Sequence, residues 1–145
     1  MTAIVMNTLT GAVSEYSLSF DSMTPTHAGS ATGLFELGGD MDGASAIVSN
    51  VVTGAQLWDA SLKKRVDMVY FSMSGQGRGE LIVQGRHAEH RYPFPVRAAG
   101  QSRQQPGKGI RENYLAFGFS NIDGDDFTLD QIEVLAAPTK TRRIG

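Results

Sequence analysis

Four aspartates near the end of the chain form the densest group of side chains that could do chemistry. Asp123, Asp125 and Asp126 follow Asn121 in a glycine-containing segment, and Asp130 lies a few residues further on. Closely spaced carboxylates can supply the several oxygen ligands that Ca²⁺ requires. The segment has neither the loop length nor the terminal Glu of an EF-hand, and Asn, Asp and Gly are also the residues that turns favour. We therefore expect a turn here, with a calcium ion bound by the four aspartates as the alternative.

Other patterns that could carry chemistry are weak. His87 and His90 are three residues apart in a segment of extended character, so their side chains would point to opposite faces. The glycines at 75, 77 and 79 are followed by neither the helix nor the Lys-Ser/Thr pair of a phosphate-binding loop. There is no Gly-x-Ser-x-Gly elbow, and the chain has no Cys to act as nucleophile, thiolate ligand or disulfide partner. We expect no enzymatic activity and no cofactor other than the calcium alternative.

Two aromatic residues are candidates for a sugar-binding platform. Trp58 is the only tryptophan, and Tyr92 lies in a segment of extended character. Sugar-binding sandwiches use exposed aromatic rings as platforms for pyranose rings, but such rings also pack into cores or rims. Glycan contact by Trp58 and Tyr92 is therefore an alternative to core packing.

Basic residues are the candidates for protein–protein contacts. The stretch 98–112 is polar and has little to bury, so it is either a linker or a loop that orders when it meets a partner. It carries Arg103, Lys108 and Arg111, and the chain ends with Arg142 and Arg143. We expect these five side chains to make assembly contacts.

The charges are distributed unevenly along the chain. Residues 1–62 carry six acids and no Lys or Arg, residues 63–112 carry ten bases and four acids, and residues 113–145 carry five acids and three bases. Folding can interleave such blocks, so that charges pair internally between neighbouring strands. Alternatively, a bipolar surface meets a copy of itself or another protein head to tail. No basic run is long and the net charge is −2, so we expect no nucleic-acid partner.

The elements that must position these side chains are short β-strands. Apolar residues recur at period two in runs separated by Gly, Asn and Asp, which is typical of strands and turns. The expected strands span 3–6, 13–20, 32–37, 46–52, 66–73, 80–84, 114–120 and 126–135. The segment 56–64 is the one candidate helix, although a single turn or an irregular loop fits it as well.

Some of the connections can be anticipated. The spacing across 74–79 predicts a hairpin turn, and 114–135 predicts a closing hairpin with a large aromatic face. The apolar parity of its second strand shifts near Asp130, which indicates a β-bulge. Pro93 and Pro95 confine their segment to a sheet edge or to a position outside any strand ladder, because proline cannot donate to a ladder.

Length and composition indicate one domain. The chain has 145 residues, of which 41% are hydrophobic, and 17 glycines. We expect an all-β fold, a single β-sandwich over 1–137 and specifically a jelly roll, followed by an extended arm from Pro138 to Gly145. No apolar run is long enough to cross a bilayer, and the opening lacks the basic and apolar regions of a signal peptide, so we expect no membrane partner.

The end of the chain resembles one known class of domain. Tyr114–Phe119, followed by Asp125–Val134 (DDFTLDQIEV), is similar to the closing hairpin of carbohydrate-binding-module-type jelly rolls. The resemblance covers about twenty-five residues and implies a fold rather than a ligand. In such modules acidic residues near this strand hold a structural Ca²⁺, which here would be Asp126 and Asp130.

The beginning of the chain resembles another class. Ile4–Tyr16 (IVMNTLTGAVSEY), together with the small-domain length, is similar to small virion structural proteins of long-tailed bacteriophages, especially tail or baseplate components. The resemblance implies a non-enzymatic, symmetric assembly role in the virion, after synthesis in the bacterial cytoplasm. Its partners would be other virion proteins and copies of itself. The alternative is a carbohydrate-binding module that contacts host-surface glycans.

Overall fold

β-Strands are the only regular secondary structure among the residues that the structure describes, and turns and loops connect them. This computed structural model describes residues 3–11, 13–16, 20–39, 41–42, 44–58 and 61–139. The chain divides into two compact units, Met1–Gly39 and Asp40–Gly145. The expected all-β class is confirmed. No helix in the described ranges is long and apolar enough to cross a membrane.

The first unit consists of short strands with little core. β1 (Ala3–Met6) pairs antiparallel with β2 (Val13–Tyr16). β4 (His27–Ser30) lies between β3 (Ser22–Met23) and β5 (Gly33–Glu36) in a second antiparallel sheet. Among the described residues of this unit, the fully buried hydrophobic side chain is that of Ala28.

The second unit contains a β-sandwich and a small ribbon. The ribbon pairs β6 (Met41–Asp42) with β7 (Ser45–Ala46). One sheet of the sandwich has the order β11-β10-β13-β8, and the other has the order β12-β9-β14, with all neighbours antiparallel. The four strands of the first sheet are Glu89–Pro95, Arg78–Gln84, Ala116–Asn121 and Asn50–Val52. The three strands of the second are Gln101–Gln104, Lys64–Gly75 and Phe127–Pro138.

Aromatic rings from both sheets form the core of the sandwich. Phe71 of β9 stacks on Phe94 of β11 at 5.0 Å between ring centroids, and it meets Phe119 of β13 edge-on at 5.7 Å. Phe127, at the start of β14, lies 4.7 Å from Phe119. Strand alternation puts every second residue on this inner face, and aromatic pairs of this geometry stabilise it beyond their buried area.

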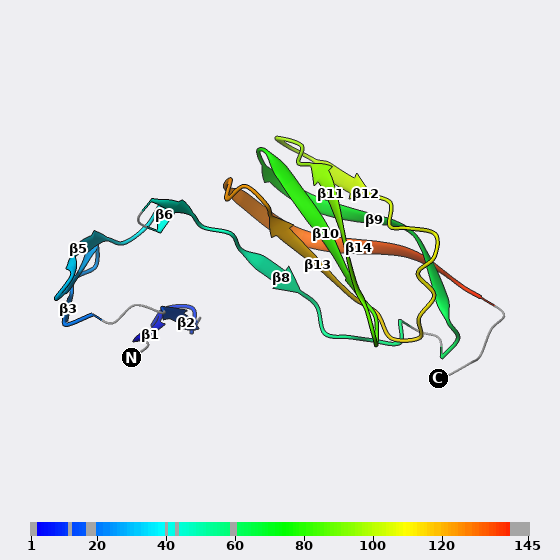
Figure 1. Cartoon of the computed structure of the whole chain (residues 1–145), viewed down its shortest axis with the longest axis horizontal. Coiled ribbons are helices and arrows are strands. Elements are labelled where there is room, and N and C mark those ends of the chain that lie inside the picture. The colour runs from blue at the N-terminus through cyan, green and yellow to red at the C-terminus, as the bar shows by residue number, and fades with distance from the viewer. Residues whose placement is uncertain are drawn as a thin grey trace. The chain divides into compact units, whose positions relative to one another are not determined.

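Both expected hairpins are wrong, because their strands belong to different sheets. β9 pairs with β12 and β14, so the turn after Gly75 carries the chain across the core to β10. The turn between β13 and β14 likewise crosses from one sheet to the other (Figure 1). Alternation places the same residues on an inner face in a hairpin and in such a crossing, so the pattern alone does not distinguish the two. The expected bulge is confirmed by a register shift between Leu129 and Gln131.

Three further segments can be compared with expectation. The helix expected over 56–64 is wrong for the described part of that segment, where Gln56 bridges Leu115 and β9 begins at Lys64. The stretch 98–112 is not wholly loop, because it contributes β12 to a sheet edge. The edge position of Pro93 and its neighbours is confirmed, since β11 is an outer strand.

The boundaries of the sandwich differ from the expected 1–137. The strands of its two sheets run from β8 to β14, whereas the described strands before residue 40 pair only with one another. At the other end, Pro138 still pairs with Lys64, and the Thr139 N–H donates to the Lys63 carbonyl at 2.7 Å. The remainder of the expected arm, including Arg142 and Arg143, lies outside the described residues.

Candidate functional site

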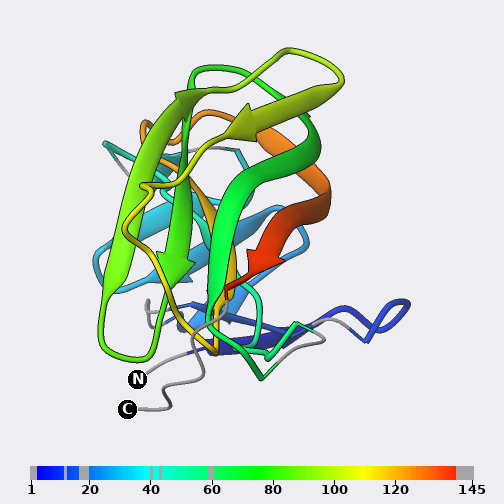
Figure 2. The ribbon, with the colours of Figure 1, turned by 90° about the vertical axis from the view of Figure 1, so that its right-hand side faces the viewer.

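A strip of bases follows one side of the sandwich. Between Glu89 and Glu112 the chain contains no acid. Four bases of this stretch are exposed, and among the described residues their charged groups form no ion pair or hydrogen bond. We call these four residues the basic strip: Arg97, Arg103, Lys108 and Arg111. Figure 2 shows this segment, yellow-green to yellow, running along the sandwich after β11.

Small and apolar anchors hold the basic strip in place. Ser102 is 1% exposed, and its hydroxyl accepts the Arg97 N–H at 3.0 Å. Pro106 and Ile110 are also buried, and β12 pairs Arg103 with Tyr70 of β9. The backbone is therefore fixed to the sandwich while the charged side chains project outward.

Arginines outside the basic strip form ion pairs among the described residues. Arg65 binds Asp67 at 2.7 Å, Arg78 binds Asp123 at 3.1 Å, and Arg91 joins Glu89 at 2.6 Å with Glu80 at 3.0 Å. Arg65 pairs within its own strand, whereas Arg78 and Arg91 each reach an acid outside their own strand, so all three arginines are paired within the second unit. None of the acids in these described pairs comes from residues 1–62.

The pKa values of two of these carboxylates are lowered by their hydrogen-bond partners. Hydrogen bonds from Arg78, reinforced by its charge, lower the pKa of Asp123. A hydrogen bond from Gln84, followed by that from Arg91, lowers the pKa of Glu89. Both carboxylates are thus held in the ionised form on the surface.

The N-terminal part of the chain exposes apolar side chains instead of burying them. Fourteen large apolar side chains are exposed in the described residues, and twelve of them lie between residues 4 and 57. Leu9 is 94% exposed, Leu34 74% and Ile4 72%. By contrast, every buried hydrophobic residue except Ala28 lies at residue 66 or later. Both units therefore expose apolar side chains that are available for contacts with other proteins.

Asp123, Asp125 and Asp126 lie in the expected turn segment that joins β13 to β14, whereas Asp130 lies within β14 at its bulge. Gly124 has φ of 80°, and the Asn121 side-chain amide donates to the Asp125 carbonyl at 3.0 Å. Asp123 is paired with Arg78. Within the described ranges, no three His, Cys, Asp or Glu side chains lie close enough together to hold a metal ion. Calcium binding by Asp123, Asp125, Asp126 and Asp130 stays a prediction.

The two candidate sugar platforms lie in different surroundings. The Trp58 indole N–H donates to the Leu115 carbonyl at 2.7 Å, and its ring meets Phe117 edge-on at 5.4 Å. Trp58 therefore packs against the core. Tyr92 is half-buried on β11, also packs against the core and stacks near His90.

A polar face that was not predicted from the sequence surrounds another tyrosine, Tyr70. Tyr70 of β9 pairs with Arg103 of β12 on one side and Glu133 of β14 on the other. In the next row with the same orientation, Ser72 pairs with Gln101 and with Gln131. The outward position of Tyr70 could have been predicted from the alternation of the strand, because its neighbours at 69 and 71 face the core.

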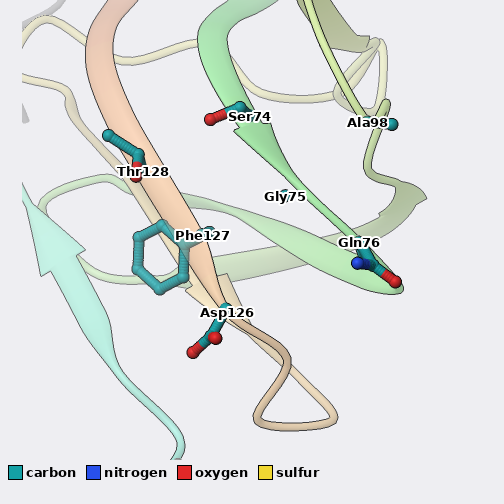
Figure 3. A pocket seen from close by; sticks show the side chains of 7 residues that line it. All are labelled: Ser74, Gly75, Gln76, Ala98, Asp126, Phe127 and Thr128. Atoms are coloured by element: carbon teal, nitrogen blue, oxygen red, sulfur yellow. The ribbon is translucent and has the colours of Figure 1, made fainter.

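A broad hollow continues this outer face at one end of the sheet. It measures about 610 Å³ and opens widely to solvent. Figure 3 shows the side chains that line it around the end of β9 and the start of β14. They are Ser74, Gly75, Gln76, Ala98, Asp126, Phe127 and Thr128. Hydroxyl, amide and carboxylate groups in such a hollow can hydrogen-bond a polar ligand.

The comparisons with known proteins do not assign this site. No family model, no curated protein and no solved structure matches the chain.

Proposed function

We propose that this chain is a non-enzymatic structural component of a bacteriophage virion, placed at the tail or baseplate, that acts through protein–protein assembly. The observation that carries the proposal is the concentration of exposed large apolar residues between residues 4 and 57. A two-stranded hairpin such as β1–β2 is marginally stable in water without a further layer. Neighbouring proteins in a particle would supply that layer.

The strand order supports a jelly-roll form of the sandwich, as in the resemblance of the C-terminal segment. Every connection from β8 to β14 crosses between the sheets except β10–β11. This is the order of an eight-stranded jelly roll, wrapped as two Greek keys, that lacks its first strand. The missing position lies beside β14.

The test of the virion role is the composition of purified particles. Particles of a phage that encodes this chain are purified on a density gradient, washed in high salt and analysed by quantitative mass spectrometry. We expect the chain in a fixed ratio to the other tail proteins, with immunogold label at the tail. Recovery of the chain only in the unassembled fraction would overturn the proposal.

The second candidate function is carbohydrate binding, which the Tyr70 face favours. Sugars combine an apolar ring face with hydroxyl edges, and Tyr70 is flanked by guanidinium, carboxylate and amide groups in register. The test is a glycan array probed with the full chain and with Tyr70→Ala. Signal that is lost in Tyr70→Ala and kept in Tyr92→Ala would support this function, and an array without signal would count against it.

A further inference from the structure

We infer that the basic strip of one copy binds the acidic N-terminal unit of a second copy, so that copies join head to tail. The inference rests on the proposed assembly function and names its partner and surfaces. Residues 1–39 carry three acids and no Lys or Arg, whereas the stretch between Glu89 and Glu112 carries five bases and no acid. The two segments are thus opposite in charge.

The acidic surface is defined by three residues of the first unit. Asp21 and Glu36 are exposed and have no base as an ion-pair partner among the described residues. Leu34, 74% exposed, lies two residues before Glu36 on the same face of β5 and pairs with Gly29. The Asp21 N–H donates to the Gly29 carbonyl at 2.8 Å, so Gly29 of β4 lies between Asp21 and Leu34 in the sheet. We call Asp21, Leu34 and Glu36 the acidic patch.

The basic strip fits such a partner for two reasons. The backbone of the strip is already fixed by the buried residues Ser102, Pro106 and Ile110. Little backbone conformational entropy is therefore lost when the strip binds a partner. The charged side chains of the strip form no ion pair within the described residues of the second unit, unlike those of Arg65, Arg78 and Arg91. A second copy of the chain necessarily brings the acidic patch at the same concentration as the strip.

The contact is heterologous, because the patch and the strip are different surfaces. Each copy therefore keeps one free patch or one free strip after the first contact, and further copies add until a ring closes or a filament forms. Charged surfaces of opposite sign fix the register of such a contact and accelerate association.

The experiment uses two full-length variants with reversed charges. The patch variant combines Asp21→Lys with Glu36→Lys, and the strip variant combines Arg103→Glu with Lys108→Glu. Light scattering at low salt should show multimers for the unaltered chain and at least about tenfold weaker association for each variant alone. Mixing the two variants in equal amounts should restore multimers, because each reversed surface then meets its complement on the other chain.

A matched control separates the contact from net charge. Asp130→Lys, on an exposed residue of β14, is compared with the single patch substitution Glu36→Lys, which changes the net charge equally. This control should assemble like the unaltered chain, and raising the salt concentration should dissociate multimers of both. Circular dichroism melting confirms that each variant is folded.

Three outcomes would overturn the inference. These are an unaltered chain that stays monomeric at low salt, a strip variant that still assembles, or a mixture that does not recover. If the chain is nevertheless found in purified particles, the proposed function stands and its contacts are with other virion proteins. If the charge swap succeeds but the particles lack the chain, the self-association stands without the virion role.

Discussion

At the scale of single residues, the charged side chains of the basic strip and the aromatic ring of Trp58 lie in opposite surroundings. Arg103, Lys108 and Arg111 are exposed on the strip, as the polar stretch around them suggested. Trp58 was a candidate platform, but it packs on the core with a left-handed φ of 45°. Whether a ring is covered depends on residues distant in sequence, here Leu115 and Phe117, which local pattern does not contain.

The Arg78–Asp123 pair leads to a pH prediction. The pKa of Asp123 is lowered in the folded state, so the pair's contribution to stability is present above the unfolded pKa and is lost as pH falls through the folded pKa. Replacing Arg78 with Gln should therefore lower Tm at neutral pH, and this difference should vanish in acid. Melting followed by circular dichroism from about pH 7 to about pH 2 measures it.

The control for this prediction is Asp123→Asn. It should lower Tm at neutral pH in the same way, and combining it with Arg78→Gln should add little, because both changes break one interaction. A Tm difference between Arg78→Gln and the unaltered chain that stays constant across the pH range would contradict the assignment.

At the scale of elements, the alternation of apolar residues predicted which side of each strand faces the core, but it did not predict which strands pair with one another. The inward residues of β9 and β13 and the bulge in β14 follow directly from period two in the sequence. The assignment of strands to sheets does not, because consecutive strands mostly lie in opposite sheets. Pairing between β9 and β14 joins residues about sixty positions apart, and such pairing is set by the packing of the whole core.

The close packing between elements gives a second prediction, at Gly79 of β10. A Cβ at this position would press into the ring of Phe119 and lie 3.2 Å from Phe94. Gly79→Ala should therefore destabilise the sandwich by about 1–3 kcal/mol, measured by urea unfolding. Gly54→Ala, whose Cβ would meet nothing within 4 Å, is the control and should change stability little. Equal effects of the two substitutions would show that β10 and β13 do not pack as described.

At the scale of the whole molecule, the buried and the exposed apolar residues lie in different parts of the chain. The buried core comes from residues 66 and later, whereas the exposed apolar residues come mainly from residues 4–57. The hydrophobic fraction of the whole chain predicted a folded domain. Because that fraction is an average, it does not show that the buried and the exposed apolar residues lie in different parts of the chain.

A third prediction concerns the end of the chain, after the last described hydrogen bond that joins it to the sandwich. A chain that ends after Thr139 keeps the bond from Thr139 to Lys63 and loses Arg142 and Arg143. We expect its Tm to be unchanged and its incorporation into particles to be weaker, measured by the particle mass spectrometry described above. Full incorporation of the shortened chain would exclude the arm from assembly, and a large drop in Tm would assign it to the fold instead.

The crossing connections also have a consequence for folding during synthesis. The N-terminal strands pair with near neighbours, and such local pairs can form early. The second sheet, in contrast, lacks β14 until Phe127–Pro138 has left the ribosome, long after the N-terminal strands. Non-local pairing of this kind is slow, so the apolar N-terminal strands are exposed on the nascent chain well before the sandwich is complete. Neighbouring chains on one messenger RNA could therefore meet through these strands before either sandwich has closed.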